Sequence, residues 1–444
     1  MGAVNPRVGV AALCSPMEVG ADRAPQAAAE LSQLLAQSGC EAVDLGVVDT
    51  PGAASAAGLR LADGHLDALA AAPVTWFEDY LVLDLLEECN LPILFWPLPG
   101  METGALCGAQ QATCCLRQLD KPAMTVFSPV SAGANLDRGM SFLRAAALHR
   151  RMRRARIGLA GRRVSGMTEV APNEFALKKT IGARVAPLDM ASLVAAAREA
   201  PGKEEYWSRL KSGAGAVRVP DESGHFAAGM TLAIREAVRR EGLSGLAFGC
   251  YPDFMGCACL AASILADEGV PVGCEGDVNG VAGMIMLNLL TGQPAHNTDW
   301  LDPLPDESVV FSHCGSGSHA LAERRQDIVL APVRLANSGV CSLFPAKPGA
   351  VTLVNLIPSG AGYQLAVMEG EALRTDMVFP GNPLRVKFPR PASEIIEWIH
   401  REGIGHHWMA GYDRVAAELG HWAAIAGPGV RMIELRCSGN SNCG

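Results

Sequence analysis

Arg7-Val-Gly-Val-Ala-Ala-Leu13 is the first of several short apolar stretches that alternate with helix-like stretches through the first part of the chain. A predicted helix follows at residues 25–38, with proline at its tolerated first position and Gly39 at its end. A second predicted strand covers residues 41–47, and the same rhythm continues to residue 127. Strands that alternate with helices in this way predict a doubly wound parallel sheet. Ligands of such sheets bind beyond the carboxyl ends of the strands.

The remainder of the chain changes character once. The alternation of strand-like and helical segments restarts at Ile157, whereas beyond residue 300 the predicted strands are short and few helices separate them. Ser359-Gly-Ala-Gly362 is typical of a hairpin loop. We therefore predict an α/β protein with two doubly wound parallel-sheet domains and a β-rich C-terminal domain, either a barrel or a sandwich. The boundaries we assign to these three domains are residues 1–155, 156–273 and 274–444.

The composition limits the possible partners and location. The chain has 444 residues and a net charge of −9, which argues against nucleic acid or an anionic membrane as the main partner. No apolar run approaches the roughly 18 to 20 residues of a membrane span. The 14 cysteines are scattered, often inside apolar segments, without the spacing of a zinc site or a disulfide framework. We expect reduced core cysteines and a cytoplasmic protein.

Two acids follow a short apolar run in Cys274-Glu-Gly-Asp277-Val-Asn-Gly280. If this segment is extended, Glu275 and Asp277 point the same way, because side chains two residues apart share a face of a strand. Two neighbouring carboxylates are costly to bury unless a cation or protons neutralise them. A divalent metal or an acid/base pair is the leading interpretation. The alternative is an ordinary pair of loop acids.

Other polar residues could join this pair. Asp253 follows a predicted strand at residues 245–249, although it could instead cap the next helix. His406 and His407 lie in a glycine-rich turn, where they could also be ordinary loop residues. His313 is a further candidate, with a purely structural role as its alternative. Neutral imidazole combined with two or three carboxylates would suit Mn²⁺ or a similar divalent ion.

Five motifs occur in a characteristic order and spacing: Cys250-Tyr-Pro-Asp253, Gly269-Val-Pro-Val-Gly-Cys-Glu-Gly-Asp-Val-Asn-Gly280, Leu290-Thr-Gly-Gln-Pro294, Phe311-Ser-His-Cys-Gly315 and Gly405-His-His407. Together they resemble the L-fucose/L-arabinose isomerase family. The resemblance spans most of the chain from about residue 150. It is weaker in the first domain, at Thr75-Trp76 and at Leu106-Cys-Gly-Ala-Gln-Gln111. The specificity lies in the set of motifs, because no single motif is distinctive.

The resemblance implies an aldose–ketose isomerase that uses Mn²⁺. It also implies a homo-oligomer, a hexamer or trimer, with an active site between subunits to which the first domain contributes. Residue by residue, Asp253, Glu275 and Asp277 match the family's metal-binding and proton-transfer carboxylates, and His407 matches its metal-binding histidine. We assign the metal to Asp253, Asp277 and His407, and proton transfer to all three acids. Relatives usually have glutamate where this chain has Asp253.

The chemistry of isomerisation fits these residue types. A proton must leave a carbon beside a carbonyl, and a cation bridging the sugar's O1 and O2 would stabilise the cis-enediolate that forms. One carboxylate would take the proton and a second would return it. We expect further side chains to contact the sugar, the tryptophans by stacking unless they pack in the core: Trp76, Gln110, Gln111, Asn279, His313, His406 and Trp408.

Two other functions compete with this interpretation. A sugar-binding or sugar-sensing protein would need no catalysis, and a metal-dependent sugar epimerase or lyase would share the enediolate. The sequence does not identify the sugar, which could be a deoxyhexose, a pentose or a hexose modified at C6, for example by sulfonate.

Overall fold

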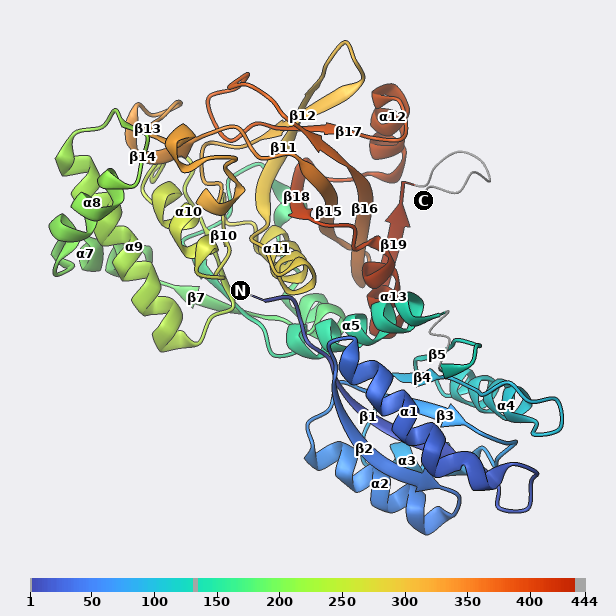
Figure 1. The fold of residues 1–444 in the computed structure, drawn as a ribbon. Coiled ribbons are helices and arrows are strands. Elements are labelled where there is room, and N and C mark those ends of the chain that lie inside the picture. The colour runs from blue at the N-terminus through green and yellow to red at the C-terminus, as the bar shows by residue number, and fades with distance from the viewer. Residues whose placement is uncertain (1, 131–134, 436–444) are drawn as a thin grey trace. The chain divides into compact units, whose positions relative to one another are not determined.

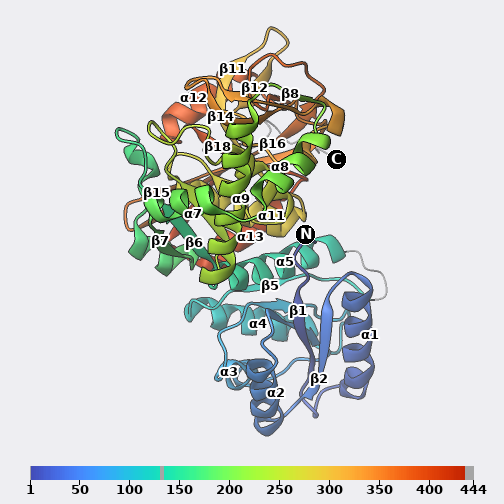
Figure 2. The ribbon, with the colours of Figure 1, turned by 90° about the vertical axis from the view of Figure 1, so that its left-hand side faces the viewer.

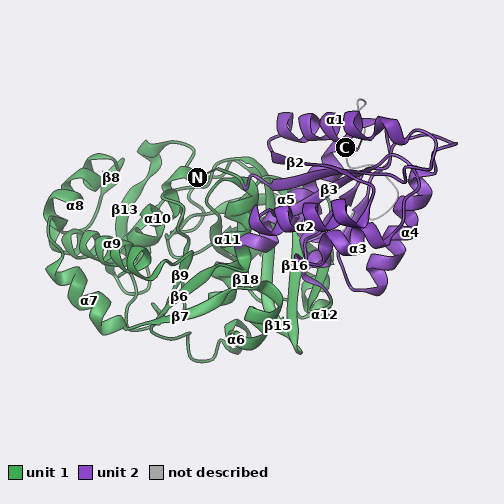
Figure 3. Cartoon of the chain, turned by 90° about the horizontal axis from the view of Figure 1, so that it is seen from below, with its two compact units in different colours: residues 1–3, 152–416, 428–444 green, residues 4–151, 417–427 purple. Residues whose placement is uncertain are grey.

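The computed structural model describes residues 2–130 and 135–435 of the chain. Contacts between residues divide the chain into two compact units (Figure 3). Unit 2 comprises residues 4–151 together with residues 417–427, and unit 1 comprises the rest. The two units are described separately below. Our division into three domains therefore stays a prediction.

Unit 2 is built on a parallel sheet of five strands in the order β2-β1-β3-β4-β5. The strands are β1 (Arg7–Leu13), β2 (Glu41–Val48), β3 (Ala68–Pro73), β4 (Ile93–Phe95) and β5 (Ala123–Thr125). The helices are α1 (Ala24–Gln37), α2 (Pro51–Asp63), α3 (Tyr80–Leu86), α4 (Ala105–Gln118) and α5 (Leu136–Met152). Figure 2 shows α1 on one side of this sheet and α2 with α3 on the other. The doubly wound sheet predicted for this part of the chain is confirmed.

A late segment of the chain returns to unit 2. Helix α13 (Ala416–Ala426) begins one residue before this segment. The carboxylate of Glu418, which is almost fully buried, accepts a hydrogen bond of 2.8 Å from Arg144 in α5. The ring of His421 meets Phe142 edge-on at 5.8 Å between centroids. These contacts attach α13 to α5.

Unit 1 contains a second parallel sheet, of four strands in the order β10-β9-β6-β7. The strands are β6 (Arg156–Ala160), β7 (Arg184–Leu188), β9 (Gly245–Phe248) and β10 (Val272–Gly273). The helices are α6 (Glu174–Ala176), η4 (Leu177–Ile181), α7 (Met190–Glu199), α8 (Lys203–Ser212), α9 (Asp221–Glu241), α10 (Cys259–Asp267) and α11 (Val278–Thr291). A small separate sheet joins β8 (Ala216–Val217), β13 (Val329–Val333) and β14 (Ser338–Leu343). The second predicted α/β sheet is also confirmed.

The β-rich part of unit 1 is a barrel and not a sandwich. Six strands run in the order β15-β18-β11-β12-β17-β16, and β15 also pairs with β16, so the ring closes. The ring strands are β11 (His296–Pro303), β12 (Ser308–Ser312), β15 (Gly349–Ser359), β16 (Gly362–Leu373), β17 (Leu384–Lys387) and β18 (His407–Tyr412). Strand β19 (Val430–Glu434) adds in parallel to β16, and helix α12 (Ala392–Glu402) precedes β18 (Figure 1). Ser359 pairs with Gly362 at the tip of the predicted hairpin.

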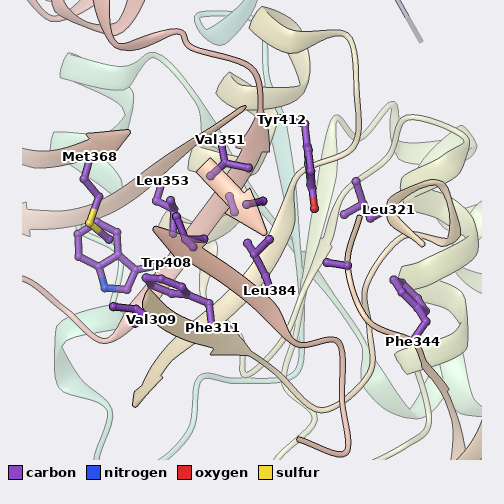
Figure 4. Packing of buried hydrophobic residues seen from close by; sticks show 14 of the residues in the cluster. Val309, Phe311, Leu321, Phe344, Val351, Leu353, Met368, Leu384, Trp408 and Tyr412 are labelled. Atoms are coloured by element: carbon purple, nitrogen blue, oxygen red, sulfur yellow. The ribbon is translucent and has the colours of Figure 1, made fainter. Parts of the chain in front are cut away.

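Large apolar side chains fill the barrel. Phe311, Leu353 and Trp408 are fully buried there, as Figure 4 shows. Helix α11 packs against the outside of β15 and β18, where a Cβ on Gly411 would lie 3.0 Å from Leu287. This close approach joins the barrel to the helix that follows the predicted acidic pair.

No helix in the described residues is both long enough and apolar enough to cross a membrane.

Truncation of a core side chain should destabilise the barrel. We expect Phe311→Ala to lower the free energy of unfolding by about 3 to 5 kcal/mol, because the change leaves a cavity in a packed core. The matched control Phe175→Ala removes a ring that is 91% exposed and should change stability by about 0.5 kcal/mol or less. Urea unfolding followed by far-UV circular dichroism measures both. Equal midpoints for the two variants would contradict this account of the core.

Candidate active site

The two predicted acids lie in a tight turn between β10 and α11. Glu275 and Gly276 both have positive φ angles, 64° and 71°. Asp277 is the N-cap of α11, and its Oδ1 accepts a hydrogen bond of 2.8 Å from the amide of Gly280. The expectation of an extended segment with both acids on one face is therefore wrong. The left-handed turn separates the two side chains.

Both acids nevertheless meet at the ring of His407. Asp277 Oδ2 lies 2.9 Å from His407 Nδ1, and Glu275 Oε2 lies 3.0 Å from His407 Nε2. His407 is the first residue of β18 and its side chain is only 3% exposed. Its carbonyl accepts a hydrogen bond of 2.7 Å from Asn355. The imidazole is held on both edges by carboxylates.

A further acid, Asp299, faces the same ring. Asp299 on β11 is the cross-strand partner of His407 on β18, and its Oδ1 lies 3.7 Å from His407 Nε2. His313 Nε2 lies 3.9 Å from Asp299 Oδ2 and 3.8 Å from Glu275 Oε2. Sequence reasoning missed Asp299. The only local signal was an acid soon after the Leu290–Pro294 motif, and its pairing with His407 depends on a strand register that the sequence does not show.

These side chains form two groups that could hold a metal ion, and both include His407. One group is Glu275, His406 and His407, and the other is Asp299, His313 and His407. Within each group the potential ligand atoms lie within 4.8 Å of one another. Asp299 Oδ1 and His313 Nδ1 are buried without a hydrogen-bond partner. Since buried polar atoms normally find partners, the donor set fits a bound divalent ion.

The protonation of the cluster follows from these contacts. Burial alone lowers the pKa of His407, but the hydrogen bonds to Asp277 and Glu275 outweigh it and raise the pKa to about 10. Burial raises the pKa of Glu275, but the nearby His313 and the hydrogen-bonded His407 together outweigh burial and hold that pKa well below its usual range. For His313, burial is outweighed by the nearby Cys274 and Asp299, and its pKa is raised. These pKa shifts favour protonated imidazoles beside ionised carboxylates when no cation is bound.

The second predicted histidine lies at the rim of this cluster. His406 has a side chain that is 46% exposed, and its Nδ1 lies 2.8 Å from Glu169 Oε1. Glu169 belongs to the short helix η3 (Thr168–Val170), in the segment that follows β6. His406 is thus accessible from solvent, as a substrate-binding group would need to be.

The structure places the other predicted residues of unit 1 differently. Asp253 is exposed in the turn after β9 and belongs to neither metal-capable group among the described residues. It does not cap the next helix either, because α10 has Ala258 as its N-cap. Asn279 is fully buried, and its amide donates to the carbonyl of Val170 and accepts from the hydroxyl of Tyr363. Trp408 lies in the barrel core, which supports the packing alternative.

The remaining predicted contacts belong to unit 2. Trp76 Nε1 donates a hydrogen bond of 3.0 Å to Gln111 Oε1, and Gln110 is exposed on the same helix, α4. Because unit 2 is described separately from unit 1, a role for these three residues at the candidate site stays a prediction.

Buried carboxylates around a shared imidazole, beside a group able to hold a cation, are what an enzyme needs to move protons next to a carbonyl. No protein-family model matches the chain. It is 25% identical to a sulfoquinovose isomerase of Alkalicoccus urumqiensis over 369 residues, which cover 80% of this chain and 83% of that protein. The sulfoquinovose isomerase of Priestia megaterium is also 25% identical, over 80% of this chain and 82% of its own length. The sulfoquinovose isomerase of Clostridium sp. (strain MSTE9) is 24% identical, over 74% of this chain and 78% of its own length.

These similarities support the predicted enzyme class, an aldose–ketose isomerase and therefore an intramolecular oxidoreductase. They point to a relative of the L-fucose/L-arabinose isomerases without confirming membership of that particular family.

Metal uptake should displace a proton from the cluster. At about pH 8 we expect Mn²⁺ binding to release about one proton per site, because a ligating imidazole must be neutral. Titration calorimetry in buffers of different ionisation enthalpy measures this number. His407→Gln should abolish the release and His225→Gln should not. Uptake without proton release in the unaltered protein would argue against His407 as a ligand.

The same shift has a consequence for stability. The pKa of His407 in the folded protein, about 10, lies above its ordinary value of 6.5. Its contribution to the metal-free fold is therefore complete below about pH 6.5 and is lost as the pH rises through about 10. Thermal melts of the EDTA-treated protein between these limits should show a falling midpoint. In His407→Gln that part of the decline should disappear.

Proposed function

We propose that the protein is a Mn²⁺-dependent aldose–ketose isomerase that converts sulfoquinovose to its ketose. One observation carries the proposal: His407 lies between Glu275 and Asp277 and faces Asp299, so that carboxylates and an imidazole share one small volume. The substrate follows from the names of the relatives, which align with most of this chain.

The metal would be held on the Nε2 side of His407. Asp277 uses both of its oxygens within the protein, one for the cap of α11 and one for His407 Nδ1. A carboxylate on one ring nitrogen fixes the orientation of an imidazole and leaves the other nitrogen for the ion. Glu275 and Asp299 lie on that other side. A bound Mn²⁺ would polarise the carbonyl of the open-chain sugar.

Proton transfer between the two carbons of the sugar needs a carboxylate that substrate can reach. Asp299 is 31% exposed and its Oδ1 has no hydrogen-bond partner, whereas Asp277 is nearly inaccessible. We therefore assign Asp299 or Glu275 to the removal of the proton and Asp277 to positioning His407. Asp253, at the neighbouring strand end, is retained as a second proton-transfer carboxylate. His406 and His313 would bind sugar oxygens.

We further propose that the enzyme works as a homo-oligomer, a trimer or hexamer. In that assembly Trp76, Gln110 and Gln111 of a neighbouring subunit would contact the sugar. A mass measurement in solution, together with complementation between Trp76→Ala and Asp299→Asn chains, tests this arrangement. Activity from mixed but not separate variants would support a shared site.

Removal of metal tests the proposed cofactor. Turnover of sulfoquinovose should fall to background after EDTA treatment and return when Mn²⁺ is added. In deuterated water the product should carry solvent deuterium, since the proton passes through an ionisable carboxyl group. Tight sugar binding without exchange would instead indicate a sugar-binding protein, and an aldose product would indicate an epimerase.

Neutralising one carboxylate tests the assignment of the acids. Asp299→Asn and Glu275→Gln should each lower kcat by about 100- to 10,000-fold, because a neutral amide cannot accept a proton. Asp302→Asn is the matched control, since Asp302 is an exposed acid on the same strand, β11. Activity of Asp299→Asn equal to that of the control would remove Asp299 from the mechanism.

A further inference from the structure

A segment of unit 1 wraps around the candidate site. It runs from Gly161, after β6, to Val170 at the end of η3 and makes three contacts with residues at or next to the site. The amide of Val164 donates to the carbonyl of Glu275 at 3.2 Å, Glu169 pairs with His406, and the carbonyl of Val170 accepts from Asn279 at 3.0 Å. This segment begins with two adjacent cations, Arg162 and Arg163.

The backbone of these arginines packs directly against the two acidic turns. A Cβ on Gly249, which precedes the Cys250–Asp253 motif, would lie 2.2 Å from the carbonyl oxygen of Arg162. A Cβ on Gly276 would lie 2.7 Å from Arg163 Cα. Both distances are shorter than any real Cβ contact, so only glycine permits the approach. The backbone of both arginines is therefore fixed at the carboxyl ends of β9 and β10, beside the turn that carries Glu275 and Asp277.

The candidate site carries several acidic side chains, which would repel an anionic substrate unless nearby cations attract it. The acids of the candidate site are Glu275, Asp277 and Asp299, with Glu169 at its rim. Among the described residues neither Arg162 nor Arg163 forms an ion pair with a carboxylate. Arg162 is exposed, and Arg163 donates a hydrogen bond to the carbonyl of Val164. Neither guanidinium is thus neutralised by a carboxylate within the described residues, although the backbone of both arginines lies beside the turn that carries Glu275 and Asp277.

The shape of a sulfonated sugar matches this arrangement. Sulfoquinovose is a glucose with a sulfonate in place of its C6 hydroxyl, so the anion lies at the opposite end of the chain from the reacting C1 and C2. Strands β6 and β10 flank β9, and neighbouring strands are about 4.8 Å apart. The loop after β6 can therefore reach a group that is several bonds away from the carbons held near the turn after β10.

We infer that Arg162 and Arg163 form the subsite that binds the C6 sulfonate of the sugar. The inference rests on the proposed function and names the residues that select its substrate. Guanidinium groups bind a sulfonate through paired, charge-assisted hydrogen bonds that a neutral hydroxyl or methyl group cannot reproduce. The two arginines recognise the substrate and take no part in proton transfer.

The test compares three sugars in the Mn²⁺-loaded enzyme. The sugars are sulfoquinovose, glucose 6-phosphate and 6-deoxyglucose, which carry a sulfonate, a phosphate and no charge at C6. The double variant R162Q/R163Q should raise KM for sulfoquinovose by about 30-fold or more, as expected when one partner of a charge pair is removed. Its kcat should change little, and its slow turnover of 6-deoxyglucose should not change. Ethanesulfonate should compete with substrate in the unaltered enzyme but not in the double variant.

Matched variants separate recognition from folding. R184Q removes an exposed arginine at the start of β7, the far end of the same sheet, and should behave as the unaltered enzyme. R163K keeps the charge but loses the planar guanidinium group. Its KM for sulfoquinovose should lie between that of the unaltered enzyme and that of R162Q/R163Q. Mn²⁺ uptake by R162Q/R163Q should equal that of the unaltered protein, which shows that the site is intact.

The outcomes distinguish this inference from the proposed function. Failure of the Mn²⁺-loaded enzyme to convert any aldose would overturn both. Conversion of sulfoquinovose with an unchanged KM in R162Q/R163Q would overturn the arginine subsite and leave the isomerase proposal standing. A preference of the unaltered enzyme for glucose 6-phosphate or for 6-deoxyglucose would overturn the assignment to sulfonate.

Discussion

The imidazole of His407, held between the carboxylates of Glu275 and Asp277, is the interaction on which the site depends. Burying any one of these groups alone would cost free energy, and their mutual hydrogen bonds offset that cost. The geometry requires a tight turn after β10 and a strand, β18, that begins at this histidine. His407 thus links the turn after the parallel sheet to the first residue of a barrel strand.

The cluster balances its charge in a way that suits exchange of a cation. Several carboxylates face two imidazoles, and without an ion the rings carry the compensating protons. A divalent ion that displaces the proton of His407 would supply positive charge at the same place. This equivalence explains how Glu275 can stay ionised in a largely buried position, as a carboxylate that accepts protons must.

Much of the fold could be predicted from the chain because it depends on local pattern. The apolar stretches of unit 2 alternate with helical stretches over short distances in the sequence. The strands form at these apolar stretches, as predicted from their pattern and from the glycines and prolines that separate them. The convergence of Glu275, Asp277 and His407 was also predictable, from the resemblance of the motifs. The path by which they converge was not. A positive φ at Glu275 is invisible in the sequence, since glutamate rarely adopts it.

The residues that sequence reasoning missed or misjudged depend on contacts between distant segments. Asp299 faces His407 only because β11 and β18 pair in one particular register. Trp408 is buried because the barrel closes around it, and closure cannot be predicted from a local sequence pattern. Asn279 is hydrogen-bonded to Val170, which lies 109 residues before it, and to Tyr363, which lies 84 residues after it.

Closure of the barrel has one more consequence. Asp299 and His407 are direct cross-strand partners in a closed ring of strands, so their spacing is set by the register of β11 and β18. The segment between β6 and α6, by contrast, belongs to no sheet and contains only the short helix η3. The proposed proton-transfer acid Asp299 and the proposed sulfonate subsite thus lie in different parts of unit 1. If the proposal holds, substitutions in the segment after β6 would change which sugar binds and would leave the pairing of Asp299 and His407 unchanged.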